Sequence, residues 1–294
     1  MTASTPTPDL GALGAWVGRT EQRSERIAAA PLAAWMATLD RTDEPEPVPG
    51  TPLPPLAHWL YFLPRALQHE LGADGHASRG GFLPPVPLPR RMWAGGRLRF
   101  ERALRVGADA LRVSTLTRVD AKQGRSGALV FVTVRHDISD ADGLAIVEEH
   151  DIVYRGEPAV ASPAGAVAPA LPPAPADAQF SRTIQPDPVL LFRYSALTFN
   201  GHRIHYDRSY VTEVEGYPGL VVHGPLIATL LADLVRREVP DARIRAFEFK
   251  AVSPLFDIHP FDACGRRDAA DGSVALWARN HDGALAMQAR AELG

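Results

Sequence analysis

The stretch Leu191-Phe-Arg-Tyr-Ser-Ala-Leu-Thr-Phe-Asn-Gly-His-Arg-Ile-His-Tyr-Asp207, followed by Val221-Val-His-Gly-Pro225, organises the chain. Three polar side chains, Asn200, His202 and His205, fall within six positions of the first segment. In the second segment a His-Gly pair stands at the predicted start of a helix. We expect the two segments to form one active site, which the rest of the chain supports and covers.

The composition of the 294-residue chain is that of a globular protein, with 46% hydrophobic and 22% charged residues. A formal net charge of −3 gives no electrostatic reason to expect nucleic acid as a partner. The single cysteine, Cys264, excludes a disulfide within the chain. The N-terminus lacks the pattern of a signal peptide, and no uncharged apolar run approaches the roughly 20 residues that span a membrane. The sequence therefore predicts a cytoplasmic protein with no membrane partner.

The N-terminal half reads as helices followed by antiparallel strands. We expect residues 1–40 to be helical after a short tail, and residues 56–71 to form a second helix that Pro64 shortens or kinks. Four prolines within residues 80–96 exclude a central strand or a helix interior, so this stretch is expected to be extended. Alternation with a period of two then predicts strands in residues 111–119, 127–138 and 145–154.

Residues 156–178 are nearly all Ala, Pro, Gly and Val and cannot form a core, so they are expected to be an extended linker. This linker divides the chain into an N-terminal domain, 1–155, and a C-terminal domain, 179–294. The second domain repeats the order of helix and strands, with a helix in 226–238, strands in 243–251, 273–279 and 285–293, and a hairpin turn in 280–283. Each half is therefore predicted to be an α+β unit, and two such units can pack side by side as a pseudo-dimer.

The central polar residues suit the addition of water to an α,β-unsaturated thioester. His205 is a candidate general base or acid, because the unperturbed pKa of histidine is about 6.5. Asn200, five positions earlier, can hold a water through its amide group. Gly224 lets a substrate approach the N–H groups of a helix N-terminus, which stabilise the enolate oxygen of a thioester. Together the three residues provide a base, a water holder and an oxyanion donor.

These residues, with Glu215-Gly-Tyr-Pro-Gly219 before the second segment, resemble the second hot-dog domain of the MaoC-like hydratase/dehydratase superfamily. Within the superfamily, the chain is most similar to the mesaconyl-C4-CoA (3-methylfumaryl-CoA) hydratases and the mitochondrial 3-hydroxyacyl-thioester dehydratases. Leu83-Pro-Pro-Val-Pro-Leu-Pro-Arg-Arg-Met-Trp-Ala-Gly-Gly96 and Val130-Phe-Val-Thr-Val-Arg-His136 resemble the paired N-terminal domain. The resemblance covers nearly the whole chain and implies an α+β double hot-dog fold, with two antiparallel sheets that each wrap a long helix.

The resemblance also implies roles for particular residues. The superfamily signature is Asp-x-Asn-Pro-x-His, and here His205 takes the His position, Asn200 the Asp position, His202 the Asn position and Arg203 the Pro position. Gly224 matches the glycine whose N–H binds the thioester oxygen. Because an amide cannot act as a base, proton transfer is expected to rest on His205, with His202 as a second candidate. The first half carries no such motif and is expected to be a degenerate hot-dog domain that forms the acyl or CoA tunnel.

Other polar residues have weaker claims. His202 is a supporting or surface residue, and His223 caps the helix and positions Gly224. Arg90, Arg91 and Arg193 are candidates for contacts with CoA phosphates, and a solvated or structural role fits them equally well. A zinc ion on His202, His205 and His223 would have an open fourth position, but the resemblance implies no metal and no redox cofactor, with coenzyme A entering only as part of the substrate. A lone histidine is most often structural, and this is expected of the remaining seven: His58, His69, His76, His136, His150, His259 and His281.

The leading hypothesis is a reversible enoyl-CoA hydratase acting on a branched C5 dicarboxyl thioester, such as mesaconyl-C4-CoA or itaconyl-CoA. The extra carboxylate of such a substrate needs an arginine, for which Arg193 and Arg203 are candidates. The alternatives are a 3-hydroxyacyl-thioester dehydratase of fatty-acid synthesis, a hot-dog acyl-CoA thioesterase and a non-catalytic acyl-CoA-binding protein. A homodimer is the assembly considered.

Overall fold

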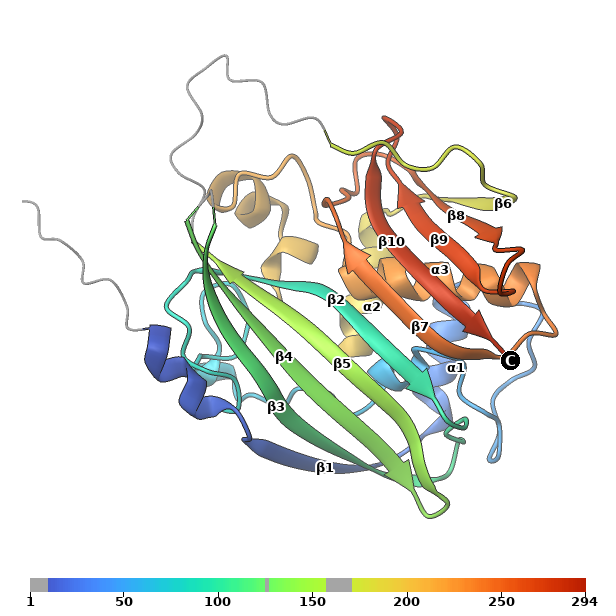
Figure 1. The fold of residues 1–294 in the computed structure, drawn as a ribbon, viewed down its shortest axis with the longest axis horizontal. Helices are drawn as coiled ribbons and strands as arrows, with labels where there is room; N and C mark the ends of the chain where they lie inside the picture. The colour runs from blue at the N-terminus through green and yellow to red at the C-terminus, as the bar shows by residue number, and fades with distance from the viewer. Residues whose placement is uncertain (1–9, 125–126, 157–170) are drawn as a thin grey trace, which may run out of the picture.

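The structure is a computed structural model that describes residues 10–124, 127–156 and 171–294. Within these residues, ten strands form one antiparallel sheet in the order β1-β3-β4-β5-β2-β7-β10-β9-β8-β6 (Figure 1). The N-terminal strands are β1 (Thr20–Arg26), β2 (Arg90–Phe100), β3 (Asp109–Gly124), β4 (Gly127–Asp140) and β5 (Gly143–Arg155). The C-terminal strands are β6 (Phe180–Ile184), β7 (Ile244–Ala251), β8 (Phe261–Arg267), β9 (Val274–Arg279) and β10 (Leu285–Leu293). The two groups join where β2 pairs with β7.

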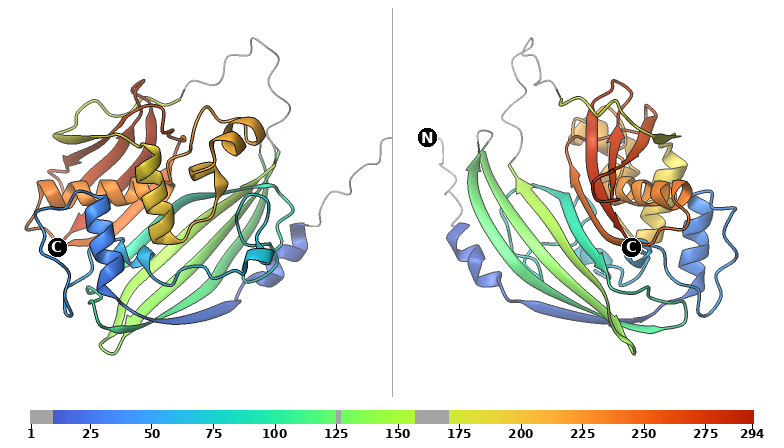
Figure 2. Two further views of the ribbon diagram at one scale, coloured as in Figure 1. Left: turned by 180° about the vertical axis from the view of Figure 1, so that it is seen from behind. Right: turned by 45° about the vertical axis from the view of Figure 1, so that its right-hand side comes forward.

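Three α-helices, α1 (Ala29–Thr38), α2 (Pro188–Thr198) and α3 (Gly224–Glu238), lie on one side of the described sheet (Figure 2). The longest, α3, packs across β8, β9 and β10. Its apolar stripe, from Leu226 to Val235, is buried, and Arg236 and Arg237 lie in the last turn, where cations favour the helix dipole. The predicted helix in the second half is therefore confirmed, and it begins two residues earlier than expected, at Gly224.

The period-two patterns correctly identified most of the strands. Val130, Val132 and Val134 of β4 are buried, as are Phe247 and Phe249 of β7. The turn predicted between β9 and β10 is present, closed by a hydrogen bond from the Asn280 N–H to the carbonyl of Ala284 at 2.9 Å. Alternation alone was sufficient here because one face of each strand meets a hydrophobic core.

The helices predicted in the N-terminal half are partly wrong. Strand β1 lies within residues 1–40, because its alternating exposure suits an edge strand paired with β3. Residues 56–71 contain only two short 3-10 turns, η2 (Ala57–Leu60) and η3 (Gln68–Glu70). The left-handed backbone of Phe62 (φ 55°), with Pro64 two residues later, prevents a continuous helix between them.

The exclusion of a central strand from residues 80–96 is also wrong. Strand β2 begins at Arg90 and pairs with β5 on one side and β7 on the other, so it lies near the middle of the sheet. All the prolines of this stretch precede Arg90, and none of them removes a ladder hydrogen bond. Gly95 and Gly96 permit the close approach of β7, since a Cβ atom at Gly95 would lie 2.5 Å from the Phe249 carbonyl oxygen.

Most of the predicted linker, 157–170, lies outside the described residues, and 171–178 contain no helix or named strand. The division at residues 155 and 179 is kept as a proposal. Besides β1 and β2, the sequence patterns did not predict α2, β6 and β8. Among the described residues, no helix is both long and apolar enough to cross a membrane.

Candidate active site

The N-terminus of helix α3, at Gly224, lies at the wall of a large cavity. His223 is the N-cap residue, in an extended conformation, and Gly224 is the first helical residue. The first N–H groups of a helix have no partner within it and carry a partial positive charge. Among the described residues, a Cβ atom added to Gly224 would meet nothing closer than the Trp93 carbonyl oxygen, at 3.9 Å. The protein itself leaves space at this helix N-terminus for a ligand.

His205 and His223 form a stacked pair behind Gly224. Their ring centroids lie 3.7 Å apart, with an angle of 18° between the planes. The Nδ1 atom of His205 lies 2.7 Å from the carbonyl oxygen of Val221, which can only accept, so Nδ1 carries the hydrogen and Nε2 is left as an acceptor. The Nε2 atom of His223 lies 2.8 Å from the Oγ atom of Ser195 on α2. The second segment therefore fixes both the orientation and the tautomer of His205.

Asn200 and His202 lie in the turn that follows α2. The helix ends at Thr198, and the left-handed backbone of its C-cap residue Phe199 (φ 48°) reverses the chain. The Asn200 side-chain oxygen then accepts a hydrogen bond from the backbone N–H of His202 at 3.0 Å. An asparagine used in this way stabilises a turn. The contact favours an orienting role for Asn200.

A loop from the N-terminal half reaches the same place. The carboxylate of Asp74 accepts hydrogen bonds from the backbone N–H and the Nδ1 atom of His76, at 3.0 and 2.9 Å. The ring of His76 lies 4.0 Å from that of His202, which in turn lies 5.4 Å from that of His205. Four imidazoles, those of His76, His202, His205 and His223, therefore follow one another along the site.

These imidazoles are held neutral by their surroundings. Burial lowers the pKa of His205 to about 4, partly offset by its bond to Val221, and burial likewise lowers the pKa of His202 to about 2. The pKa of His223 falls well below its usual value for the same reason. The hydrogen bond from His76 lowers the pKa of Asp74, which is ionised near neutral pH. The site thus offers neutral imidazole acceptors beside one carboxylate.

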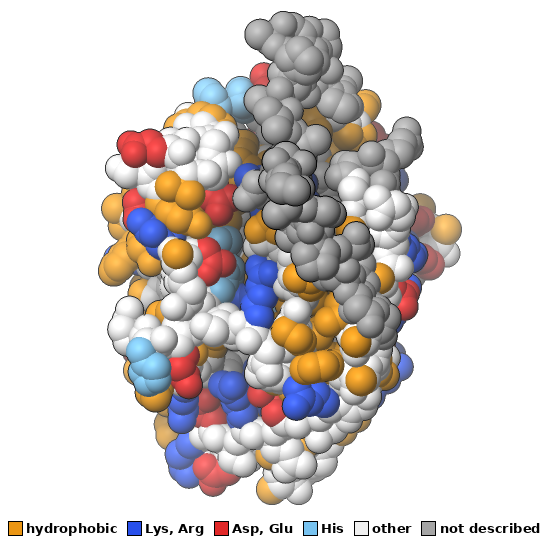
Figure 3. Space-filling model, turned by 90° about the vertical axis from the view of Figure 1, so that its left-hand side faces the viewer, with side chains coloured by type: hydrophobic (Ala, Val, Ile, Leu, Met, Phe, Trp, Pro, Cys, Tyr) orange, Lys and Arg blue, Asp and Glu red, His pale blue; other side chains and the backbone are white. Residues whose placement is uncertain are grey.

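The cavity that contains this group has a volume of about 1530 Å³. That is larger than an ordinary small-molecule site, and it suits a long substrate with a bulky carrier. Residues of both halves line it, from the loop 71–84 and from β2, β4 and β5 to the segment 192–206. Figure 3 shows a face on which histidine and arginine or lysine side chains gather around a hollow.

The wall formed by the N-terminal half carries a second polar group. The side chain of Glu148 is buried and accepts from Trp59 Nε1 at 3.0 Å, while its other oxygen lies 2.9 Å from Nε2 of His58. Burial lowers the pKa of His136 to about 4 and that of His150 to about 3. The ring of His150 packs on Trp93, with centroids 3.9 Å apart. This wall of the cavity therefore carries buried polar groups as well as apolar side chains.

The predicted arginine contacts divide into two groups. Arg91 and Arg203 line the cavity, whereas Arg90 and Arg193 do not. Arg203 binds Asp207 at 2.8 Å and the Ala73 carbonyl at 3.0 Å. Arg193 is exposed on α2, and Arg90 pairs with Glu215 at 3.5 Å.

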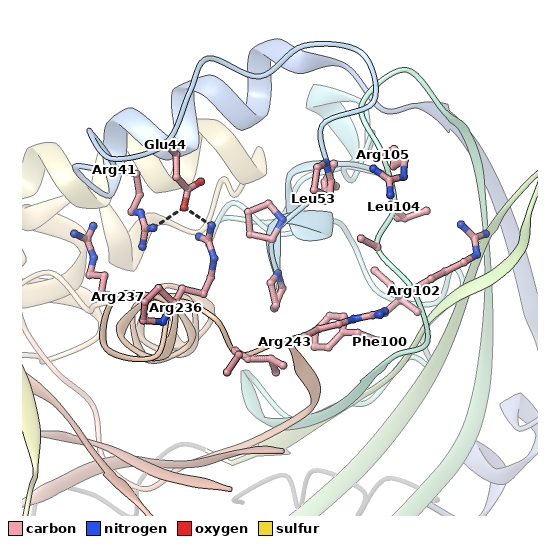
Figure 4. A pocket seen from close by; sticks show the side chains of 18 of the residues that line it. Arg41, Glu44, Leu53, Phe100, Arg102, Leu104, Arg105, Arg236, Arg237 and Arg243 are labelled. Carbon is pink, nitrogen blue, oxygen red and sulfur yellow. Dashed lines mark hydrogen bonds and ion pairs between the residues drawn. The ribbon is translucent and has the colours of Figure 1, made fainter. Parts of the chain in front are cut away.

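A second pocket, of about 700 Å³, lies near the C-terminal end of α3, roughly 20 Å from Gly224 at 1.5 Å per helical residue. Glu44 bridges two of its arginines, Arg41 and Arg236, as Figure 4 shows. Asp233 binds Arg41 at 2.9 Å and Arg237 at 2.7 Å. No imidazole of the described residues lines this pocket, so the candidate active site is the larger cavity.

Sequence reasoning missed several cavity residues. His58, His76, His136 and His150 were expected to be structural, yet all four line the cavity. Only His76 had a usable local signal, because an aspartate two positions earlier and a glycine between them suit a tight turn that orients an imidazole.

Solved structures share the architecture. A MaoC-like dehydratase superposes with a TM-score of 0.68 at 15% identity, covering 96% of this chain and 99% of that one. A conserved hypothetical protein of Mycobacterium tuberculosis, described as having a double hotdog fold, superposes with a TM-score of 0.58 at 14% identity, covering 97% and 98%. The chain has the α+β double hot-dog fold.

The chain belongs to the hydroxyacyl-thioester dehydratase type 2 family, whose model matches residues 56–257. It is 50% identical over 283 residues to the mesaconyl-C(4)-CoA hydratase of Chloroflexus aurantiacus, covering 95% of this chain and 97% of the relative. It is 30% identical over 239 residues to the mitochondrial hydroxyacyl-thioester dehydratase type 2 of Schizosaccharomyces pombe, covering 73% and 78%. The chain is therefore a carbon–oxygen lyase of the hydratase/dehydratase type, and the resemblance stated from the sequence is confirmed.

Proposed function

We propose that this protein hydrates a branched C5 dicarboxyl enoyl-CoA, with mesaconyl-C4-CoA as the first candidate and itaconyl-CoA as the second. The 50% identity to a mesaconyl-C(4)-CoA hydratase over nearly the full length of both chains is the main support. The cavity volume of about 1530 Å³ is in keeping with an acyl group carried on coenzyme A. The proposal needs no metal or redox cofactor and leaves the protein in the cytoplasm.

In the proposed mechanism, the thioester oxygen lies on the Gly224 N–H. His205 holds a water through Nε2 and takes a proton from it as the oxygen attacks Cβ. The electron pair of the double bond moves to the thioester, and the enolate oxygen is stabilised by the helix N-terminus. The proton then passes from His205 to Cα, which restores the thioester carbonyl and the neutral imidazole. Asn200 orients the turn that carries His202.

The free carboxylate of the dicarboxyl group requires a cation in the cavity. Arg203 is already bound to Asp207, and Arg193 lies outside the cavity. In the part of the chain that the structure describes, Arg90 has a carboxylate partner and Arg91 has none. Arg91 lines the cavity that contains both polar groups, and its charge is one of the causes that lower the pKa of His76, His150 and His202. Arg91 is therefore the residue we assign to the free carboxylate.

The test is a hydration assay with mesaconyl, itaconyl, crotonyl and longer enoyl-CoA thioesters. The wild type should be most active on the C5 dicarboxyl substrates. His205→Ala should reduce kcat by about 10²–10⁴-fold, the usual contribution of a general base. Arg91→Met should reduce kcat/KM on mesaconyl-C4-CoA by about 10–100-fold, the worth of a hydrogen bond to a charged group, and change it little on crotonyl-CoA. Arg90→Met is the matched control and should affect both substrates alike.

A second candidate is a 3-hydroxyacyl-thioester dehydratase of fatty-acid synthesis. It is supported by the family match and by the similarity to the Schizosaccharomyces pombe dehydratase. Greater activity on crotonyl or longer-chain thioesters, including those on acyl-carrier protein, would favour it over the dicarboxyl proposal.

Release of free thiol from an acyl-CoA would instead indicate a thioesterase. The homodimer is tested by sedimentation of the full chain.

A further inference from the structure

The resemblance aligns Asn200 with the aspartate of the superfamily signature, and the structure shows that the Asn200 side-chain oxygen is already bound. It accepts from the N–H of His202 at 3.0 Å. An amide cannot take up a proton, and this oxygen is committed to a turn. A water bound to Nε2 of His205 therefore needs a second acceptor, for its other hydrogen, that fixes its orientation toward Cβ.

A second imidazole with an available acceptor stands on the same wall. Both oxygens of Asp74 contact His76, one through the backbone N–H and one through Nδ1. Because a carboxylate only accepts, Nδ1 of His76 carries the hydrogen and Nε2 is an acceptor. His76 lines the cavity, and its ring lies 4.0 Å from that of His202. Its tautomer therefore matches that of His205.

The loop of His76 is fixed to the turn that carries Asn200 and His202. The N–H of Arg203 donates to the carbonyl of Asp74 at 2.9 Å, and its guanidinium donates to the carbonyl of Ala73 at 3.0 Å. Gly75 lies so close to Gly201 that a Cβ atom would be 1.9 Å from the Gly201 oxygen. These contacts between the two halves hold His76 in a defined place beside the turn that carries Asn200 and His202.

We propose that His76, oriented by Asp74, is the second acceptor of the attacking water. This inference rests on the proposed function and adds a catalytic residue to it. His205 accepts the hydrogen that leaves the water, and His76 accepts the other hydrogen of the same water, which stays on the product hydroxyl. The water is then oriented with a lone pair toward Cβ. Asp74 is a positioning residue.

The pH dependence of catalysis distinguishes this role from a structural one. His76 faces Asp74 and Arg79 from its own loop, Arg91 from β2, and His202 and His205 from the C-terminal half. Burial lowers the pKa of His76, and Asp74 opposes that effect. Both imidazoles must be neutral to accept, so protonation of His76 contributes to the acid limb of kcat/KM. Asp74→Asn removes the anion that supports the His76 cation, which moves this limb to lower pH.

The experiment uses the full-length protein and the best substrate of the enoyl-CoA panel. His76→Ala should reduce kcat by about 10²-fold and leave an acid limb set by His205, near pH 4. His76→Gln, which retains an acceptor, should recover part of the loss. Asp74→Asn should reduce kcat and shift the limb downward. His69→Ala, an exposed histidine nearby that does not line the cavity, is the matched control and should leave both unchanged.

Two results would overturn the inference. The first is a His76→Ala variant that keeps the kcat and the acid limb of the wild type, when the wild type itself hydrates the substrate. The other concerns a metal, since ligand atoms of Asp74, His76 and His202 lie within 4.8 Å of one another. If a chelator abolished wild-type activity and Zn²⁺ restored it, these residues would be metal ligands. A wild type inactive on every enoyl-CoA would instead refute the proposed function itself.

Discussion

The contact between Gly75 and Gly201 gives the sharpest prediction about how the two halves cooperate. Gly75 has a left-handed backbone (φ +87°), and in Gly75→Ala the new Cβ atom would lie 1.9 Å from the Gly201 oxygen and 2.8 Å from its carbonyl carbon. To reach ordinary contact at 3.4 Å, the two loops must separate by about 1.5 Å. His76 would then move away from His202 and His205.

Two effects contribute to the expected size. A left-handed backbone costs a non-glycine residue about 1–2 kcal/mol of stability. The displacement adds a loss of activity, because a shift of about 1 Å in a catalytic group can reduce rate by about 10²-fold. Gly18→Ala is the matched control: its φ is +91°, but a Cβ atom there would meet nothing within 4 Å. Gly18→Ala should therefore lose the same stability from its left-handed backbone but should not separate the two loops.

The assay compares the free energy of unfolding in urea and kcat/KM for hydration in the two variants. Gly75→Ala should lose about 10²-fold in kcat/KM under conditions where it remains folded, and Gly18→Ala should keep nearly wild-type activity. Equal activity in the two variants would show that contact between the loops does not position the site, and the reasoning would be refuted.

Three further predictions concern stability. The carboxylate of Asp233 is fully buried and binds Arg41 and Arg237. Asp233→Ala should therefore lower the free energy of unfolding by about 3–5 kcal/mol. The control is Asp109→Ala, which removes an exposed ion pair with Arg26 and should change the free energy of unfolding by less than about 1 kcal/mol. Ser195→Ala removes the hydrogen-bond partner of the buried His223 ring and should cost about 1–3 kcal/mol in urea unfolding and reduce activity, since His205 stacks on that ring. Burial lowers the pKa of His136 and His205 to about 4 and that of His150 to about 3, so between about pH 6.5 and 4 the unfolded chain binds more protons than the folded one. Stability should therefore fall on acidification through this window, by up to about 1.4 kcal/mol per pH unit for each such histidine, and a stability that stayed flat in urea titrations from pH 7 to 4 would contradict it.

Local patterns revealed those features that depend on a few neighbouring residues. Alternation in β4 and β7 and the apolar stripe of α3 predicted these elements, because each has one face against the core. The exclusion of a central strand by prolines failed for β2, which lies near the middle of the sheet because all the prolines precede it. What made it central was its pairing with β7, about 150 residues later in the chain, and no local pattern encodes that pairing.

The sequence by itself determined the family, the α+β double hot-dog fold, and the two segments that carry His205 and Gly224. Residues close together in the chain form that part of the site, so their spacing was sufficient. Only the tertiary structure placed Asp74 and His76 beside His202, and Arg91 in the cavity wall. Contacts between residues more than 100 positions apart depend on how the two halves pack, and a pattern read along one segment contains no information about that packing.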